Sequence, residues 1–215
     1  SVPARFVGEQ LDAVLEDLDV RAVKIGMLGD AEVIEAIASR LRERPEIPLV
    51  LDPVMVATSG DRLIPETAVA AIVESLLPIT DLATPNLPET AVLAGLDVRS
   101  PDDFEAAGRA VLARGARNVL VKGGHLDGDE VIDVLVSADG AGRLINPRIE
   151  TTNTHGTGCT LSAAVAARLA LGDLMAAAVV TARAYLQRAL IASVDRRIGT
   201  GHGPVDHLVD LRGEG

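Results

Sequence analysis

Short apolar runs alternate with helical patterns along most of this 215-residue chain, at Ala22–Met27, Leu49–Leu51, Leu82–Ala83 and Val119–Val121. These runs lack the polar alternation of a half-exposed strand, which is typical of strands that are buried on both faces. Between them, apolar residues recur at helical spacing, as at Val33, Ile34, Ile37 and Leu41. Such a chain is expected to form a mainly parallel sheet with helices on both faces. We therefore predict the α/β class, a three-layer α/β/α sandwich, with residues 1–215 as one domain.

Capping residues and prolines set the predicted ends of the helices. Asp30 can cap a helix that must stop by Arg44, since a proline follows directly. Asn86 with Glu89 three residues later has the pattern of a capping box, and Gly95 would end that helix. Further helices are expected from Pro65 to about Leu77, from Ser100 onward, and over Cys159–Leu171 and Leu174–Val194.

One stretch departs from the alternation of strand and helix. Asp127-Gly128 separates the run Val119–Val121 from the run Val131–Val136, which is a strong signal for a hairpin. The segment Arg143–Ile149 offers one more strand after it. The sheet is therefore expected to be mainly, not wholly, parallel.

Composition excludes several classes of function. The chain has 20 Lys and Arg against 31 Asp and Glu, a net charge of −11, with one Tyr, two Phe and no Trp. It lacks the basic clusters and stacking aromatics on which nucleic-acid binding depends. Its one cysteine, Cys159, cannot form an intramolecular disulfide, and no apolar run is long enough to span a bilayer. We therefore expect a cytoplasmic protein with neither a nucleic-acid nor a membrane partner.

Residues able to carry chemistry stand directly after the predicted strands. They are Gly26-Met27, Asp52-Pro53, Pro85-Asn86 and Lys122-Gly123-Gly124. In open parallel sheets, ligands bind beyond the carboxyl ends of the strands. The sequence therefore predicts a ligand site at that edge of the sheet.

A glycine-rich stretch, Asn153-Thr154-His155-Gly156-Thr157-Gly158-Cys159-Thr160, leads directly into an apolar helix. Glycines let the backbone approach a ligand, and the free N–H groups of a helix start favour an anion such as phosphate. The same pattern also fits an ordinary glycine-rich helix start with an inert cysteine. Spacing alone leaves both interpretations open.

Three further residues also have two interpretations. Lys122 could reach a phosphate as a point charge, or it could be a strand-end lysine that extends to solvent. Asp52 could orient a hydrated Mg²⁺ or cap the following turn. Glu89 could serve a metal ion or only the capping box. The four histidines lie in separate loops without zinc spacing, which favours solvated or structural roles.

Six motifs occur in an order that is typical of one family. They are Lys24–Leu28, Asp52–Val56, Thr84–Glu89, Val121–His125, Asn153–Thr160 and Gly201–His207. On these motifs the chain, from about Val2 to its C-terminus, resembles the hydroxymethylpyrimidine/phosphomethylpyrimidine kinases of thiamine biosynthesis, in the ribokinase-like superfamily. Each motif is weak alone, whereas six in one order are highly specific.

The resemblance implies ATP-dependent phosphorylation of 4-amino-5-hydroxymethyl-2-methylpyrimidine, then of its monophosphate to the diphosphate. It implies ATP and Mg²⁺ as cofactors and a homodimer. The transferring phosphoryl group would be surrounded by Gly156, Thr157, Gly158 and Cys159, and Cys159 would help to activate the substrate hydroxyl. ATP would be bound by Lys122, Asn153, Thr157 and Glu89. The metal ion would be held by Asp52 and Glu89. The pyrimidine pocket would be lined by Met27, Val54 and Cys159.

One departure from the family leaves alternatives open. The family opens with a strand and a Gly/Ser-rich loop that supply part of the pyrimidine site, then a further strand and a lid-like element with a glutamine. Nothing in this sequence matches them, so a non-catalytic nucleotide-binding protein is one alternative. A pyridoxal or pyridoxine kinase of the same superfamily is another, although a cysteine at 159 instead of aspartate favours the pyrimidine branch. A thiol enzyme with Cys159 as nucleophile and His155 as base is the least favoured.

Overall fold

The computed structural model describes residues 2–55 and 63–211, so that Val56, the end of the second motif, lies outside the described residues. Within these described residues, six strands form one sheet in the order β1-β2-β3-β4-β5-β6. The first four pair in parallel, and the last two add antiparallel neighbours. The prediction of a mainly parallel sheet is therefore confirmed. The strands are β1 Val23–Ile25, β2 Leu49–Leu51, β3 Leu82–Ala83, β4 Asn118–Val121, β5 Glu130–Ser137 and β6 Gly140–Pro147.

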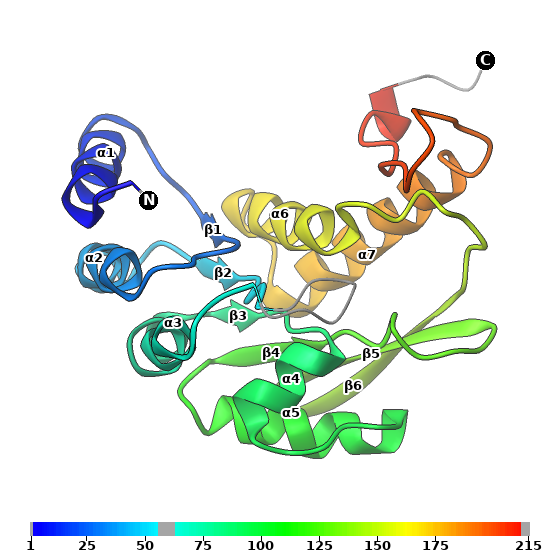
Figure 1. Ribbon diagram of the computed structural model, residues 1–215, viewed down its shortest axis with the longest axis horizontal. Helices are drawn as coiled ribbons and strands as arrows, with labels where there is room; N and C mark the ends of the chain where they lie inside the picture. Colours follow the sequence, from blue (N-terminus) through cyan, green and yellow to red (C-terminus); the bar gives the residue numbers. More distant parts are fainter. Residues whose placement is uncertain (1, 56–62, 212–215) are drawn as a thin grey trace.

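Helices cover both faces of this sheet (Figure 1). One face carries α6 (Thr157–Ala170) and α7 (Met175–Ile191). The other carries α2 (Ala31–Arg42), α3 (Glu66–Ala71), α4 (Leu87–Ala94) and α5 (Phe104–Leu112). The N-terminal helix α1 (Ala4–Asp17) packs against α2. The predicted three-layer sandwich is therefore confirmed.

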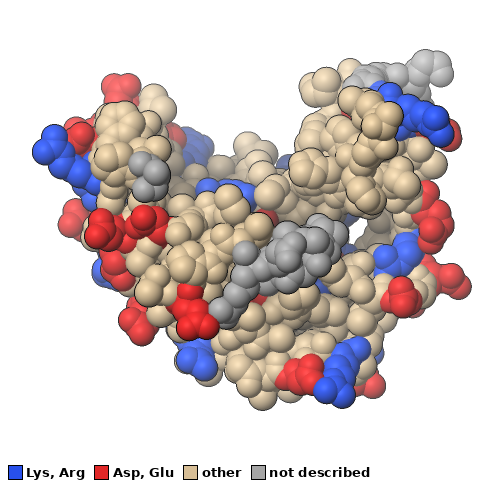
Figure 2. Space-filling view, in the orientation of Figure 1, with Lys and Arg blue, Asp and Glu red and all other residues tan. Residues whose placement is uncertain are grey.

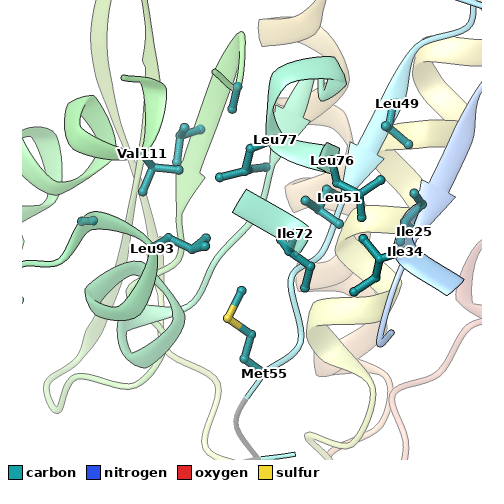
Figure 3. Close-up of a cluster of buried hydrophobic side chains, with 14 of the residues drawn as sticks. Ile25, Ile34, Leu49, Leu51, Met55, Ile72, Leu76, Leu77, Leu93 and Val111 are labelled. Atoms are coloured by element: carbon teal, nitrogen blue, oxygen red, sulfur yellow. The ribbon is translucent and has the colours of Figure 1, made fainter. Parts of the chain in front are cut away.

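Side-chain alternation along the strands divides the interior into two cores. Leu49 and Leu51 of β2 join the core beneath α2 to α5, whereas Val50 joins the core beneath α6 and α7. Figure 3 shows Leu49 and Leu51 beside Ile34 and Leu76 in the first of these cores. Because successive strand residues point to opposite faces, a strand covered on both sides must be apolar throughout. Each fully buried Leu or Ile side chain contributes about 1.5–3 kcal/mol.

The capping predictions agree with the structure. Asp30 accepts a hydrogen bond from the Glu32 backbone N–H at 2.9 Å, and α2 ends before Arg44. Asn86 and Glu89 form the expected capping box. Gly95 ends α4 in the left-handed region, with φ of 67°, where a side chain would be strained. Within the described ranges, no helix is both long and apolar enough to cross a membrane.

The expected helix from Pro65 to Leu77 is not one α-helix. After α3 the chain widens into a π-helical turn, η1 (Ile72–Leu76), and then tightens into a 3₁₀ turn, η2 (Leu77–Ile79). Pro78 lies in η2, and a proline has no N–H to continue the α-helical ladder. The α-helical hydrogen bonding therefore gives way before the proline.

The hairpin prediction is right about pairing and incomplete about turns. Strands β4 and β5 pair antiparallel, as Asp127-Gly128 indicated. The tighter turn joins β5 to β6 at Ala138-Asp139, where Ser137 pairs with Gly140. Gly140 follows this turn with φ of 153°, a backbone conformation that glycine adopts without strain. The last strand therefore begins at Gly140 and ends at Pro147, earlier than Arg143–Ile149.

Candidate active site at the carboxyl ends of the parallel strands

The residues directly after β2, β3 and β4 lie side by side because these strands pair in register. Backbone N–H groups of Asp52 and Thr84 each donate at 2.9 Å to the preceding strand, at Ile25 and Leu51. The Lys122 N–H donates at 2.9 Å to the Pro85 carbonyl. Each residue thus extends the ladder one step beyond its strand. The predicted clustering at this edge of the sheet follows from the register.

Asp52 and Lys122 form an ion pair at this edge. Lys122 Nζ lies 2.9 Å from Asp52 Oδ1, and the two side chains are 14% and 2% exposed. The Thr84 hydroxyl donates to the same carboxylate at 3.2 Å and the Ser162 hydroxyl at 3.3 Å. A buried carboxylate is costly unless it is paired and hydrogen-bonded. These three donors offset that cost and fix the Asp52 carboxylate.

The first turn of α6 packs directly against this pair. A Cβ atom on Gly158 would lie 3.2 Å from Lys122 Nζ and 3.7 Å from Asp52 Oδ2. Gly156 caps the helix in the left-handed region, with φ of 83°. In the described part of the chain, the N–H groups of Gly158 and Cys159 donate to no protein acceptor. The helix start therefore offers free N–H groups and the positive end of the dipole beside Lys122.

Glu89 serves the capping box and also faces the ion pair. Its carboxylate accepts the Asn86 N–H at 2.8 Å, and its side chain is buried. Burial raises the pKa of Glu89, and the negative charge of Asp52 adds to that rise. The positive charge of Lys122 and hydrogen bonds from the N–H groups of Asn86 and Met55 oppose it. The two interpretations of Glu89 are therefore compatible, since one carboxylate caps α4 and senses both charges of the pair.

Cys159 lines an open hollow that begins at the helix start. The hollow has a volume of about 680 Å³ and runs between α6 and α7 from Gly156 and Cys159 to His207 and Asp210. Figure 2 shows the surface deeply notched above α6, with acidic side chains spread around the rim of this face. The Cys159 side chain is exposed. A small molecule in the hollow could therefore reach the thiol.

The remaining predicted residues are less closely gathered. Met27 is 60% exposed and Val54 is half-buried. Asn153 is buried, and its amide donates to the Arg196 carbonyl at 2.8 Å and to the Ser193 carbonyl. Its side chain thus ties the segment after α7 to the start of α6.

His207 and His125 both lie near residues of the predicted site. His207 Nε2 lies 2.9 Å from the Thr160 hydroxyl. Partial desolvation, and after it the positive charge of Lys122, lower the pKa of His125. His125 is therefore close enough to the site to be affected by the charge of Lys122. Among the described residues, no hydrogen bond joins His155 to Cys159. The thiol-enzyme alternative therefore has no geometric support.

Sequence reasoning missed two hydroxyls of the site. Thr84 stands first after β3, the position already singled out in the neighbouring strands. Ser162 follows Gly158 by four residues, and its hydroxyl oxygen also lies 3.0 Å from the Gly158 carbonyl oxygen. The helical spacing of four could have indicated that Ser162 shares a face with Gly158.

The carboxylates of the site fit a hydrated Mg²⁺ ion rather than one bound by protein ligands alone. No group of three or more His, Cys, Asp and Glu in the described ranges could hold a metal ion by itself. Asp52 and Glu89 remain as two carboxylates near one lysine. Mg²⁺ is commonly bound through one or two carboxylates, with waters and substrate phosphates completing its shell. These residues therefore suit a hydrated ion that arrives with a nucleotide.

A buried Lys-Asp pair beneath a glycine-rich helix start, within an α/β/α sandwich, is an arrangement that suits a phosphotransferase. The family model of phosphomethylpyrimidine kinase matches residues 1–206, and the chain belongs to this family.

Individual relatives agree with that membership. A hydroxymethylpyrimidine/phosphomethylpyrimidine kinase of Rhizobium meliloti is 51% identical over 209 residues, 96% of this chain and 78% of the relative. The solved phosphomethylpyrimidine kinase of Clostridium difficile has a TM-score of 0.77 and 34% identity, covering 88% of this chain and 78% of that one. The pyridoxal kinase of Staphylococcus aureus in complex with AMP-PCP and pyridoxal has a TM-score of 0.88 and 31% identity, covering 99% of this chain and 76% of that one.

Proposed function

We propose that this chain transfers phosphate from ATP to hydroxymethylpyrimidine, and then to its monophosphate, in thiamine diphosphate biosynthesis. The observation that carries the proposal is the packing of Gly158 against Lys122 and Asp52. It gathers free N–H groups, a lysine and a carboxylate around one point, which is what phosphoryl transfer needs. The substrate class rests on the family and on the names of its members.

In the proposed reaction, the substrate hydroxyl oxygen bonds to the γ-phosphorus as the bond to the bridging oxygen of ADP breaks. The hydroxyl proton passes to Cys159 Sγ, which must be a thiolate to accept it. The N–H groups of Gly158 and Cys159, with the Lys122 ammonium, stabilise charge on the transferring group. Mg²⁺, when bound, neutralises charge on the β- and γ-phosphates, and Asp52 and Glu89 would hold it through its waters.

The other roles remain predictions from the family resemblance. Thr157 would contact the transferring phosphoryl group, and Met27 and Val54 would line the pyrimidine. Asn153 would serve ATP by fixing the segment after α7, because its amide is committed to that backbone. A homodimer in the cytoplasm is likewise a prediction.

A pyridoxal kinase is the second candidate. It is favoured by the close similarity in fold to the Staphylococcus aureus enzyme, whose complex contains pyridoxal. Both substrates are flat heteroaromatic rings with a hydroxymethyl group, so the phosphate site cannot distinguish them. The two candidates therefore have to be separated by competition.

The test is mass spectrometry of the products formed with Mg-ATP, hydroxymethylpyrimidine and pyridoxal in one reaction. We expect the pyrimidine monophosphate first and the diphosphate later. A preference for pyridoxal in kcat/KM would overturn the ranking. ATP binding without transfer to either acceptor would favour the non-catalytic alternative.

A further inference from the structure

The backbone residue next to Lys122 is held by a second buried carboxylate that the proposed reaction does not use. Gly123 N–H donates at 2.8 Å to Asp133 Oδ1 on β5. Arg183 Nε of α7 donates at 2.8 Å to the other oxygen, Asp133 Oδ2. Arg183 also donates to the Leu144 carbonyl of β6 at 2.9 Å. One arginine thus joins α7, β5 and β6 to the end of β4.

This contact replaces a step of the sheet ladder. The β4–β5 pairing ends at Val121 opposite Val134, and the Asp133 side chain supplies the next hydrogen bond in place of a backbone carbonyl. A Cβ atom on Gly123 would collide with the Ile132 carbonyl oxygen and would lie 2.8 Å from the Phe104 ring. The end of β4 is therefore confined from both sides at Gly123.

The burial of the Asp133–Arg183 pair needs a reason beyond stability. The two side chains are 8% and 9% exposed. Apolar residues of similar volume often stabilise an interior as well as a buried ion pair does. Apolar residues could not, however, accept the N–H of Gly123. The carboxylate is the part of the pair that acts on the site.

We propose that Asp133, held by Arg183, is a positioning residue that fixes the end of β4 and so sets where Lys122 meets the phosphates of ATP. This inference rests on the proposed function, because it assumes that ATP binds at Lys122. Neither residue touches the substrate or the reacting atoms in the proposed reaction. Their effect reaches the site through one backbone N–H.

The test is a substitution that keeps shape and removes one acceptor. In Asp133→Asn, the amide cannot accept from both Gly123 and Arg183. We expect KM for ATP to rise about tenfold, the effect of one lost hydrogen bond to a charged group, with KM for the pyrimidine unchanged. A pair with only a structural role would lower the melting temperature and the active fraction and leave KM for ATP unchanged, which would overturn the proposal.

A double variant supplies the rescue. The double variant combines Asp133→Asn with Arg183→Gln. In glutamine, as in arginine, the first polar atom is bonded to Cδ, so the glutamine oxygen can take the place of Arg183 Nε. There it can accept a hydrogen bond from the Asn amide. The Asn oxygen is then free for Gly123, and we expect KM for ATP to return to within about threefold of wild type. The control is Asp12→Asn, which breaks the Arg40–Asp12 pair between α1 and α2 and should leave KM for ATP unchanged. If Asp133→Asn does not fold, failure of the double variant to bind ATP as wild type does overturns the proposal.

Binding of AMP-PCP, measured by calorimetry, separates this inference from the proposed function. If wild type binds the analogue but phosphorylates neither acceptor, the proposed function fails alone, and weaker binding by Asp133→Asn still supports the positioning role. If folded Asp133→Asn binds the analogue as wild type does, the positioning role fails alone. Absence of binding by wild type overturns both.

Discussion

Two interior ion pairs hold Lys122 and Gly123, the adjacent residues directly after β4, and they differ in what surrounds them. Asp52 pairs with the side chain of Lys122, and two hydroxyls from other elements share its carboxylate. Asp133 pairs with Arg183 and accepts the backbone N–H of Gly123. In the first pair, the carboxylate has hydroxyl donors besides its cation, and the pair lies against the helix start of α6. The second has one cation and one N–H.

The difference indicates a division of labour between chemistry and geometry. A cation beside free helix N–H groups can meet an incoming anion, and Lys122 lies beside such groups beneath Gly158. A cation that donates to protein acceptors on two strands, as Arg183 does to Asp133 and Leu144, serves position. We therefore expect substitutions in the first pair to affect catalysis most and those in the second to affect stability most.

The largest expected effect is on catalysis at Lys122. Lys122→Met removes the point charge that faces the transferring group, and kcat/KM should fall by a factor of about 10³. Asp52 keeps its two hydroxyl donors, so the free energy of unfolding should fall by only about 1–3 kcal/mol. The measurements are ADP formation with hydroxymethylpyrimidine as acceptor and urea unfolding. A loss in kcat/KM of less than tenfold would contradict the catalytic role expected of the first pair.

Lys122→Arg is the matched variant, because it keeps the charge and enlarges the group. The chain has two lysines among its 20 basic residues, so a compact ammonium at 122 stands out against a background of arginine. Because Gly158 packs closely against Lys122 Nζ, a larger guanidinium would have to point away from the helix start. We expect this variant to fold normally and to recover little of the lost activity.

The second prediction separates the helix start from the ion pair. Gly158→Ala would press a methyl group toward Lys122 Nζ at 3.2 Å. Activity should fall about 10- to 100-fold through displaced donors, while stability should rise by up to about 1 kcal/mol because alanine favours the helix. Gly142→Ala is the control, since nothing lies within 4 Å of its Cβ position. Full activity in Gly158→Ala would show that the helix start takes no part.

The two pairs also show what a sequence can and cannot predict. The strands were predictable because burial on both faces leaves an uninterrupted apolar run, as at Leu49–Leu51. Asp52 and Lys122 were predictable one at a time, since each follows such a run. Ser162, a further partner of Asp52, was not predictable, because it lies 110 residues from Asp52 and only the packing of α6 brings the two together.

Asp133 was hidden for a different reason. It lies inside the run Val131–Val136, and a single polar residue in such a run is normally expected to face solvent. The structure buries it, because α7 covers that face and Arg183 supplies the counter-charge. An aspartate in a strand cannot be recognised as buried until its cation, 50 residues later, is known.

The third prediction reverses the first. Arg183→Met leaves the Asp133 charge with the Gly123 N–H and no cation, and unfolding free energy should fall by about 3–5 kcal/mol. Activity per folded molecule should fall less than in Lys122→Met. The comparison is made by urea unfolding of both variants at one temperature, with ADP formation measured well below each midpoint. Greater instability in Lys122→Met than in Arg183→Met would contradict the proposed division.

The smallest effect concerns an aspartate at the surface that accepts N–H groups as Asp133 does. Hydrogen bonds from the backbone of Arg99 and Ser100 and from the Ser100 hydroxyl lower the pKa of Asp103 below its ordinary 3.8. A carboxyl with a lowered folded-state pKa adds stability above its unfolded pKa, and that stability is lost as the pH falls through the folded value.

Asp103→Asn should therefore be less stable than wild type at pH 7, and the gap should close as the pH falls below about 4. The measurement is the difference in urea midpoint between the two proteins at pH 7, 5, 4 and 3, in which carboxyls common to both cancel. Ser100→Ala removes one of the donors and should shrink the pH-dependent part without abolishing it. A gap that stays constant to pH 3 would mean that the N–H groups bind the neutral acid as well as the carboxylate, and would weaken the same argument for Gly123 and Asp133.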